Sequence, residues 1–134
     1  MFKNILVPID LRSEASPRKA LPVAGDLARH YGARLIVLYV VPDVWATQGE
    51  SAENRTLTQK IRDIAGECLR ADTAAEILVK HHNSPHRCIR EVAEEVGADL
   101  IVMTSHDPAL RDLRLGSNAT QVVHHAECSV LVLR

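Results

Sequence analysis

Gly116, Ser117 and Asn118 stand directly before a short stretch of helical periodicity, and their types suit the binding of a phosphate group. The amino end of a helix offers free backbone amides and a partial positive charge, both of which attract phosphate. Gly116 lets the backbone approach a ligand closely, and Ser117 can cap the helix or donate its hydroxyl. An ordinary helix cap explains the same residues, so phosphate binding needs support from elsewhere in the chain.

Asp10 and the segment Thr104-Ser105-His106-Asp107 are polar groups that each follow an apolar run of strand length. Asp10 fits two interpretations equally: a magnesium ligand or ribose acceptor, and a turn residue before the first helix. His106 is the one attractive acid–base candidate in this set. We therefore expect binding of a ligand rather than efficient catalysis.

The other histidines do not form a convincing catalytic or metal-binding pattern. His81, His82 and His86 lie close together, but no cysteine or carboxylate accompanies them at ligand spacing, so we expect no metal. His124 and His125 are adjacent on a helix and point in different directions. The chain has no G-x-S-x-G elbow, Walker lysine motif or H-E-x-x-H motif.

Apolar runs of strand length alternate with segments of helical periodicity along the whole chain. This alternation predicts the α/β class: a single doubly wound, Rossmann-like, five-stranded parallel sheet with helices on both faces, in one domain over residues 1–134. The expected strands lie at 5–9, 35–41, 75–80, 99–103 and 129–133, and the expected helices lie near 16–31, 57–68, 85–96 and 119–126.

Glycines and polar stretches set the expected boundaries of these elements. Gly32 and Gly97 should end the first and third helices. The first helix opens either at residues 16–17 or earlier, near residue 13. Residues 43–55 are polar and irregular, which predicts an exposed loop or a small lid.

The composition excludes several classes of partner. The 134 residues include 17 acidic and 16 basic side chains and only 3% aromatics, so nothing favours binding to nucleic acid or an anionic membrane. No apolar stretch approaches the length of a membrane span, and the amino-terminal apolar run is too short for a signal peptide. Cys68, Cys88 and Cys128 form no C-x-x-C pair, and we expect them reduced in a cytoplasmic protein.

Doubly wound sheets bind ligands beyond the carboxyl ends of the strands, where the strand order reverses. A five-stranded sheet of this kind commonly places its first and fourth strands side by side at that point. We therefore expect residues 8–10 to face residues 104–107 across a cleft.

The sequence resembles the universal stress protein family in four pieces. They are KNILVPID, GARLIVLYVVP, GADLIVMTSH and LGSNATQVVHHAECSVLVLR, which follow one another over essentially the full chain. The last piece is most similar to the F/G branch of the bacterial proteins. The resemblance implies the adenine nucleotide alpha hydrolase-like fold and binding of ATP or AMP, with magnesium as an optional companion.

The nucleotide pattern of the family is only partly present. Thr104 and Asp107 stand where the family has its first two glycines, and the spacer to Gly116 has eight residues rather than nine. Two side chains thus occupy positions where backbone should approach phosphate, and Asp107 adds a like charge unless a metal intervenes. Arg111 and Arg114 are expected to be solvated loop charges. The resemblance implies these nucleotide-binding residues: Pro8, Ile9, Asp10, Val40, Met103, Thr104, His106, Gly116, Ser117 and Asn118.

The last expected strand should form an edge of the sheet, and an apolar edge needs a partner. By the family resemblance we predict a homodimer joined through Cys128 to Arg134, a self-complementary contact. Three functions remain open: a regulatory dimer that binds an adenine nucleotide and an unknown protein partner, a nucleotide-free interaction module, and a weak ATPase.

Overall fold

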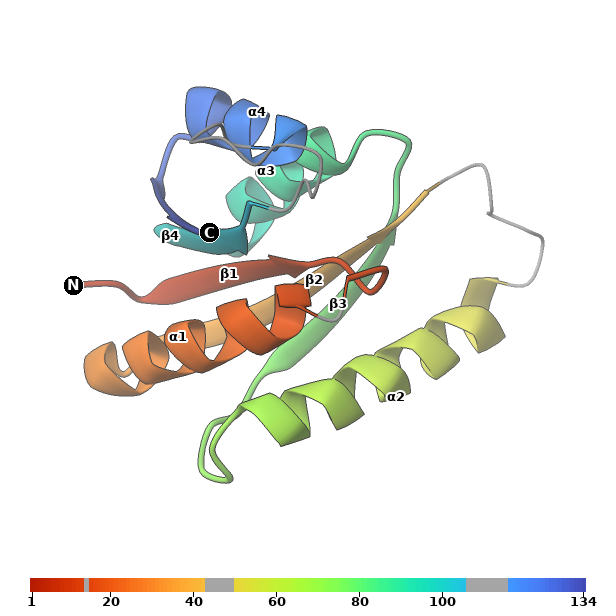
Figure 1. Cartoon of the computed structure of the whole chain (residues 1–134), viewed down its shortest axis with the longest axis horizontal. Coiled ribbons are helices and arrows are strands. Elements are labelled where there is room, and N and C mark those ends of the chain that lie inside the picture. Colours follow the sequence, from red (N-terminus) through yellow and green to blue (C-terminus); the bar gives the residue numbers. More distant parts are fainter. Residues whose placement is uncertain (14, 43–49, 106–115) are drawn as a thin grey trace.

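The chain folds around one five-stranded parallel sheet with the order β3-β2-β1-β4-β5, which confirms the predicted doubly wound α/β fold (Figure 1). The computed structural model describes residues 1–13, 15–42, 50–105 and 116–134. The elements are β1 (Asn4–Ile9), α1 (Ala15–Tyr31), β2 (Arg34–Val41), α2 (Glu50–Cys68), β3 (Glu76–His81), α3 (Pro85–Val96), β4 (Leu100–Thr104), α4 (Ser117–His125) and β5 (Ser129–Leu133).

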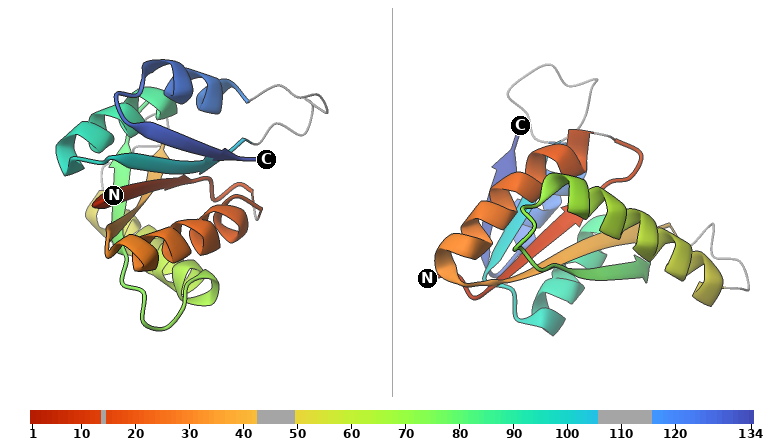
Figure 2. Two further views of the ribbon diagram at one scale, coloured as in Figure 1. Left: turned by 90° about the vertical axis from the view of Figure 1, so that its left-hand side faces the viewer. Right: turned by 90° about the horizontal axis from the view of Figure 1, so that it is seen from below.

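Helices cover both faces of the sheet, with α1 and α2 on one face and α3 and α4 on the other (Figure 2). The side chains of β1 alternate between the two resulting cores. Ile5 and Val7 pack with residues of α1 and α2, whereas Leu6 packs with Ile89 and Val92 of α3. Because both faces are buried, the central strands are continuously apolar rather than alternating.

The switch point of the sheet lies at β1, which pairs with β2 on one side and β4 on the other. The amino end of this junction is fastened by Asp99. Its carboxylate accepts backbone N–H bonds from Lys3 (2.8 Å) and Asn4 (3.0 Å). Helix α1, which follows β1, and helix α4, which follows β4, lie on opposite faces of the sheet, which is the arrangement expected at a ligand-binding switch point.

Gly32 and Gly97 end helices α1 and α3, as predicted. Both adopt the left-handed conformation, with φ of 63° and 64°. After Gly32, the amide of Ala33 donates to the carbonyl of Ala28 at 2.8 Å and closes the last turn. A side chain at either glycine would strain the backbone, so glycine is required at both turns.

The structure differs from the expected starts of helices α2 and α1. Helix α2 begins at Glu50, so residues 50–55 are helical and not part of a loop; residues 43–49 lie outside the described chain. The polar segment 50–55 has no apolar residue at core spacing, and periodicity therefore gave no signal there. Helix α1 begins at Ala15, between its two expected starts, and Pro22 lies inside the helix.

Candidate functional site

A cavity of about 230 Å³ lies at the carboxyl ends of the central strands. Nine of the ten residues expected to bind nucleotide line it, and His106 lies outside the described residues together with Asp107, Arg111 and Arg114. The sheet order brings these nine together, because β1 and β4 are neighbours and α4 starts beside them. They are Pro8, Ile9, Asp10, Val40, Met103, Thr104, Gly116, Ser117 and Asn118.

Eight further residues line the cavity and were not expected from the sequence. Some were within reach of sequence reasoning, because they directly flank expected residues or follow the end of β3 at the same edge of the sheet. Others, such as Ile89 on α3, enter through packing that no motif marks. The eight are Arg12, Ser16, Tyr39, Pro42, His82, Asn83, Pro85 and Ile89.

Asp10 is a turn residue whose carboxylate is held by Arg12. The backbone N–H of Arg12 donates to Asp10 Oδ1 at 2.9 Å, which closes a turn of the kind aspartate favours after a strand. The Arg12 guanidinium adds bonds of 3.1 Å to Oδ1 and 3.2 Å to Oδ2. Of the two interpretations of Asp10, the structure supports the turn, and both carboxylate oxygens are already engaged.

The Asp10–Arg12 pair also acts on its neighbour Tyr39. Hydrogen bonding and charge from Asp10 raise the pKa of the Arg12 guanidinium, so this group stays protonated. Burial is the main cause that raises the pKa of the Tyr39 phenol, and the negative charge of Asp10 adds to it while Arg12 opposes it. At neutral pH this wall of the cavity therefore presents one ion pair and one neutral phenol.

A chain of hydroxyl contacts crosses the switch point beneath the cavity. The Ser16 side chain accepts from the Asp10 amide at 3.1 Å, and the Thr104 hydroxyl donates to Ser16 Oγ at 3.3 Å. Thr104 stands where the family pattern has a glycine, and its hydroxyl is tied to the start of α1. The threonine thus links β1, α1 and β4 in addition to narrowing the cavity.

The amino end of α4 opens on the cavity. Gly116 is the N-cap and Ser117 is the first helical residue, so the expectation that Ser117 caps the helix is wrong. The Gly116 amide donates to Ser105 Oγ at 2.8 Å, which fixes the helix start to the end of β4. The first hydrogen bond within α4 runs from the Thr120 amide to the Gly116 carbonyl. The amides that precede Thr120 in the first turn therefore have no acceptor within the helix. Its first turn carries no acidic side chain, so this end attracts anions.

His82 orients the wall of the cavity contributed by the β3–α3 connection. Its Nδ1 accepts the Ser84 amide at 2.9 Å, so the proton of the neutral ring lies on Nε2, which faces Glu91 Oε2 at 3.4 Å. His81 instead contacts Asn54 at 2.7 Å. Over the described ranges, no group of three or more histidine, cysteine, aspartate or glutamate side chains is placed to hold a metal.

Comparison with known proteins settles the family. The model of the universal stress protein family matches residues 1–134. The chain belongs to this family. Universal stress protein G of Escherichia coli O157:H7, from the branch that the terminal motif resembles, is 31% identical over 143 residues and matched over the full length of both chains.

Solved structures of universal stress proteins share this fold. The Archaeoglobus fulgidus universal stress protein in complex with dAMP has a TM-score of 0.73 and 23% identity, over 98% of each chain. A universal stress protein in complex with cAMP has a TM-score of 0.71 and 24% identity, over 99% of this chain and 97% of that one. None of the helices in the described part of this protein is long and apolar enough to cross a membrane.

Proposed function

We propose that the cavity binds an adenine nucleotide, AMP or ATP, and that the protein works in the cytoplasm as a regulatory homodimer of the stress response, folded as one domain over residues 1–134. One observation carries the nucleotide proposal. Residues from β1, β2 and β4 and the open amino end of α4 line the same cavity at the switch point of the sheet. The similar structures in complex with dAMP and cAMP support binding of an adenine nucleotide by this family.

Each end of the nucleotide has a matching wall in this proposal. The apolar side chains of Ile9 and Met103 enclose the nucleoside, and the backbone at Val40 faces adenine. The first-turn amides of Ser117 and Asn118 donate to the phosphate oxygens, since free helix amides and the helix dipole both favour an anion.

The cavity favours a short phosphate chain bound without a metal at Asp10. Its volume of about 230 Å³ is small for a ligand pocket, and pockets for drug-sized ligands span about 300–1,000 Å³. Arg12 already neutralises Asp10, so a magnesium ion would have to displace a guanidinium that makes two side-chain bonds. We therefore propose AMP as the preferred nucleotide, with ATP and Mg²⁺ as the competing alternative.

Calorimetric titration with AMP and ATP, each with Mg²⁺ and with EDTA, tests this proposal. We expect AMP to bind equally well in both buffers. Ser117→Ala should weaken AMP several-fold because it removes a hydroxyl at the phosphate end. Thr56→Ala removes a hydroxyl that bonds the Ala52 carbonyl on α2, and it serves as the matched control. Two results together would favour the nucleotide-free interaction module. They are the absence of binding heat with either nucleotide and a purified protein without the raised absorbance near 260 nm that copurified nucleotide gives.

The dimer is proposed through the edge strand β5. Its side chains Val130, Leu131, Val132 and Leu133 are only half-buried in the described chain, and β5 ends the strand order. An apolar edge with unpaired backbone groups favours pairing with a second copy. A two-fold contact through residues 128–134 satisfies both copies with one surface.

A weak ATPase is the enzymatic alternative, and His106 is its acid–base candidate. Under the binding proposal we expect neither the wild type nor His106→Ala to hydrolyse ATP at ordinary enzyme rates, because regulated binding needs no general base. Turnover at ordinary enzyme rates that His106→Ala abolishes would replace the binding proposal with catalysis.

A further inference from the structure

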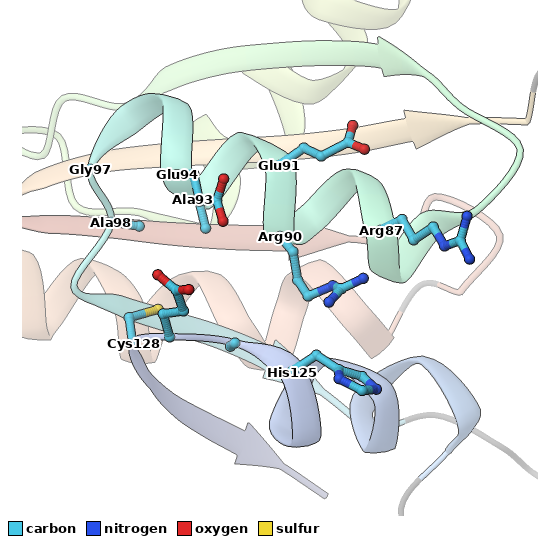
Figure 3. Close-up of a pocket in the computed structure, with 11 residues that line it drawn as sticks. Arg87, Arg90, Glu91, Ala93, Glu94, Gly97, Ala98, His125 and Cys128 are labelled. Atoms are coloured by element: carbon cyan, nitrogen blue, oxygen red, sulfur yellow. The ribbon is translucent and has the colours of Figure 1, made fainter.

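A groove of about 650 Å³ lies between α3 and the carboxyl end of α4, on the face of the sheet that these helices cover (Figure 3). It is distinct from the nucleotide cavity, because no residue lines both. Arg90 projects from α3 across this groove toward His125 at the end of α4, and Arg87 lies one turn earlier on α3 (Figure 3). The nucleotide proposal uses none of these three side chains.

One end of the groove gathers positive groups without internal counter-ions. Neither Arg87 nor Arg90 belongs to any ion pair found among the described residues, whereas Arg12, Arg18 and Arg34 are each paired with a carboxylate. The Nε of Arg90 and the Nδ1 of His86 are both buried and have no hydrogen-bond partner in the described chain. A buried polar atom without a partner is costly, so the Arg90 Nε–H, which can only donate, favours a ligand that supplies an acceptor.

Glu91, Glu94 and Glu127 also line the groove, and none of them forms an ion pair with Arg87 or Arg90 among the described residues. Glu91 lies on the side of α3 away from Arg90 and faces His82 at 3.4 Å (Figure 3). Glu94 lies toward the opposite end of the groove, beside Gly97 and Cys128 (Figure 3). The positive end therefore has no acidic side chain between the two arginines and His125 in Figure 3.

The titration of His86 is consistent with this charge distribution. Burial is the main cause that lowers its pKa, and the charges of Arg90, Arg87, His125 and His82 lower it further, in that order. No negative group offsets them among these causes. Beside burial, the guanidinium groups of Arg90 and Arg87 are thus the largest influences on His86, which lies next to them on α3.

We propose that the α3–α4 groove binds a phosphate group through Arg90, with Arg87 and His125 beside it. Guanidinium groups hold phosphate by charge-assisted hydrogen bonds, which are stronger than those between neutral groups. The ligand class is an inorganic phosphate or a small phosphate monoester, since the groove is open and presents few donors. The site stands independently of the nucleotide cavity and would persist if that cavity bound nothing.

The test follows the Arg90 Nε–H cross-peak in 15N-labelled protein while phosphate replaces chloride at constant ionic strength and pH 7. Inorganic phosphate and glycerol 3-phosphate are titrated separately, and the ligand that binds more tightly identifies the source of the phosphate. We expect a saturable shift at Arg90 and His125. Amides of Gly116 and Ser117 report separately on the nucleotide cavity, so the two proposals can fail independently.

Arg90→Gln should weaken this binding about tenfold or more, as expected for the loss of a charge-assisted bond. Arg62→Gln makes the same charge change on exposed α2 and should leave affinity unchanged. Arg87→Gln, at an exposed position, gives a second variant if Arg90→Gln alters the fold seen in the amide spectrum. Shifts that grow linearly without saturation, that occur only at Gly116 and Ser117, or that persist unchanged in both groove variants would overturn the proposal.

Discussion

The guanidinium of Arg12 reaches both carboxylate oxygens of Asp10, at 3.1 and 3.2 Å, at the mouth of the cavity. The pair is local, because the two residues lie in one turn that a backbone bond of 2.9 Å closes. A local pair of this kind forms without help from the ligand. The cavity thus meets an anion with its only described lining carboxylate already neutralised.

Replacing Arg12 should make nucleotide binding dependent on metal. In Arg12→Gln the Asp10 carboxylate loses its counter-ion and repels phosphate, so we expect AMP affinity in EDTA to fall about tenfold, equivalent to about 1.4 kcal/mol. Mg²⁺ should restore part of the loss by taking the place of the guanidinium. Calorimetry measures both effects. The double variant Asp10→Asn/Arg12→Gln removes the carboxylate as well and should bind independently of Mg²⁺; equal metal dependence in the single and double variants would contradict this account.

Local chemistry made most of the fold predictable. Gly97 ends α3 because its left-handed backbone disfavours side chains, and β1 is apolar from Ile5 to Ile9 because both faces of the sheet are covered. The sheet order then placed the ends of β1 and β4 together, which is why the expected site residues line one cavity. What the sequence did not reveal carries no motif or periodic signal. Arg12 is an unremarkable polar residue until its turn brings it onto Asp10, and the first six residues of α2 include no apolar residue larger than Ala52 to mark them.

Two glycines in helices should respond oppositely to alanine. Gly66 in α2 has open space where a Cβ would lie, so Gly66→Ala should raise the free energy of unfolding by about 0.5–1 kcal/mol through helix propensity. At Gly25 in α1 a Cβ would come within 2.6 Å of Leu69 Cδ2. In Gly25→Ala, overpacking should therefore cancel the gain in helix propensity. Its free energy of unfolding should be lower than that of Gly66→Ala by about 1–3 kcal/mol. Urea denaturation measures both, and a Gly25→Ala variant as stable as Gly66→Ala would show that Leu69 moves aside freely.

The edge strand should be protected from hydrogen exchange only while the protein is dimeric. In a monomer, the outward backbone amides of β5 face solvent and exchange quickly, whereas pairing with a second copy slows them. We expect sedimentation at micromolar concentration to give twice the chain mass of 14.8 kDa. Protection within residues 129–133 should then decline on dilution, while Ile101 in the buried strand β4 stays protected. A monomeric mass with concentration-independent exchange at β5 would exclude this interface.

His86 should titrate below its ordinary pKa, and Arg90 should be one cause. The shift arises first from burial and then from Arg90, Arg87, His125 and His82, so Arg90→Gln should raise the midpoint while Arg62→Gln leaves it unchanged. The sign for stability follows from the same shift. A histidine whose pKa is lower in the folded state binds more protons when unfolded, so the protein should lose stability as pH falls through the unfolded value near 6.5, and His86→Gln should reduce that loss. Proton NMR of the imidazole and urea denaturation at pH 5 and 8 measure the two effects. A midpoint at or above the ordinary value in the wild type would mean that a nearby acid, rather than the arginines, controls this end of the groove.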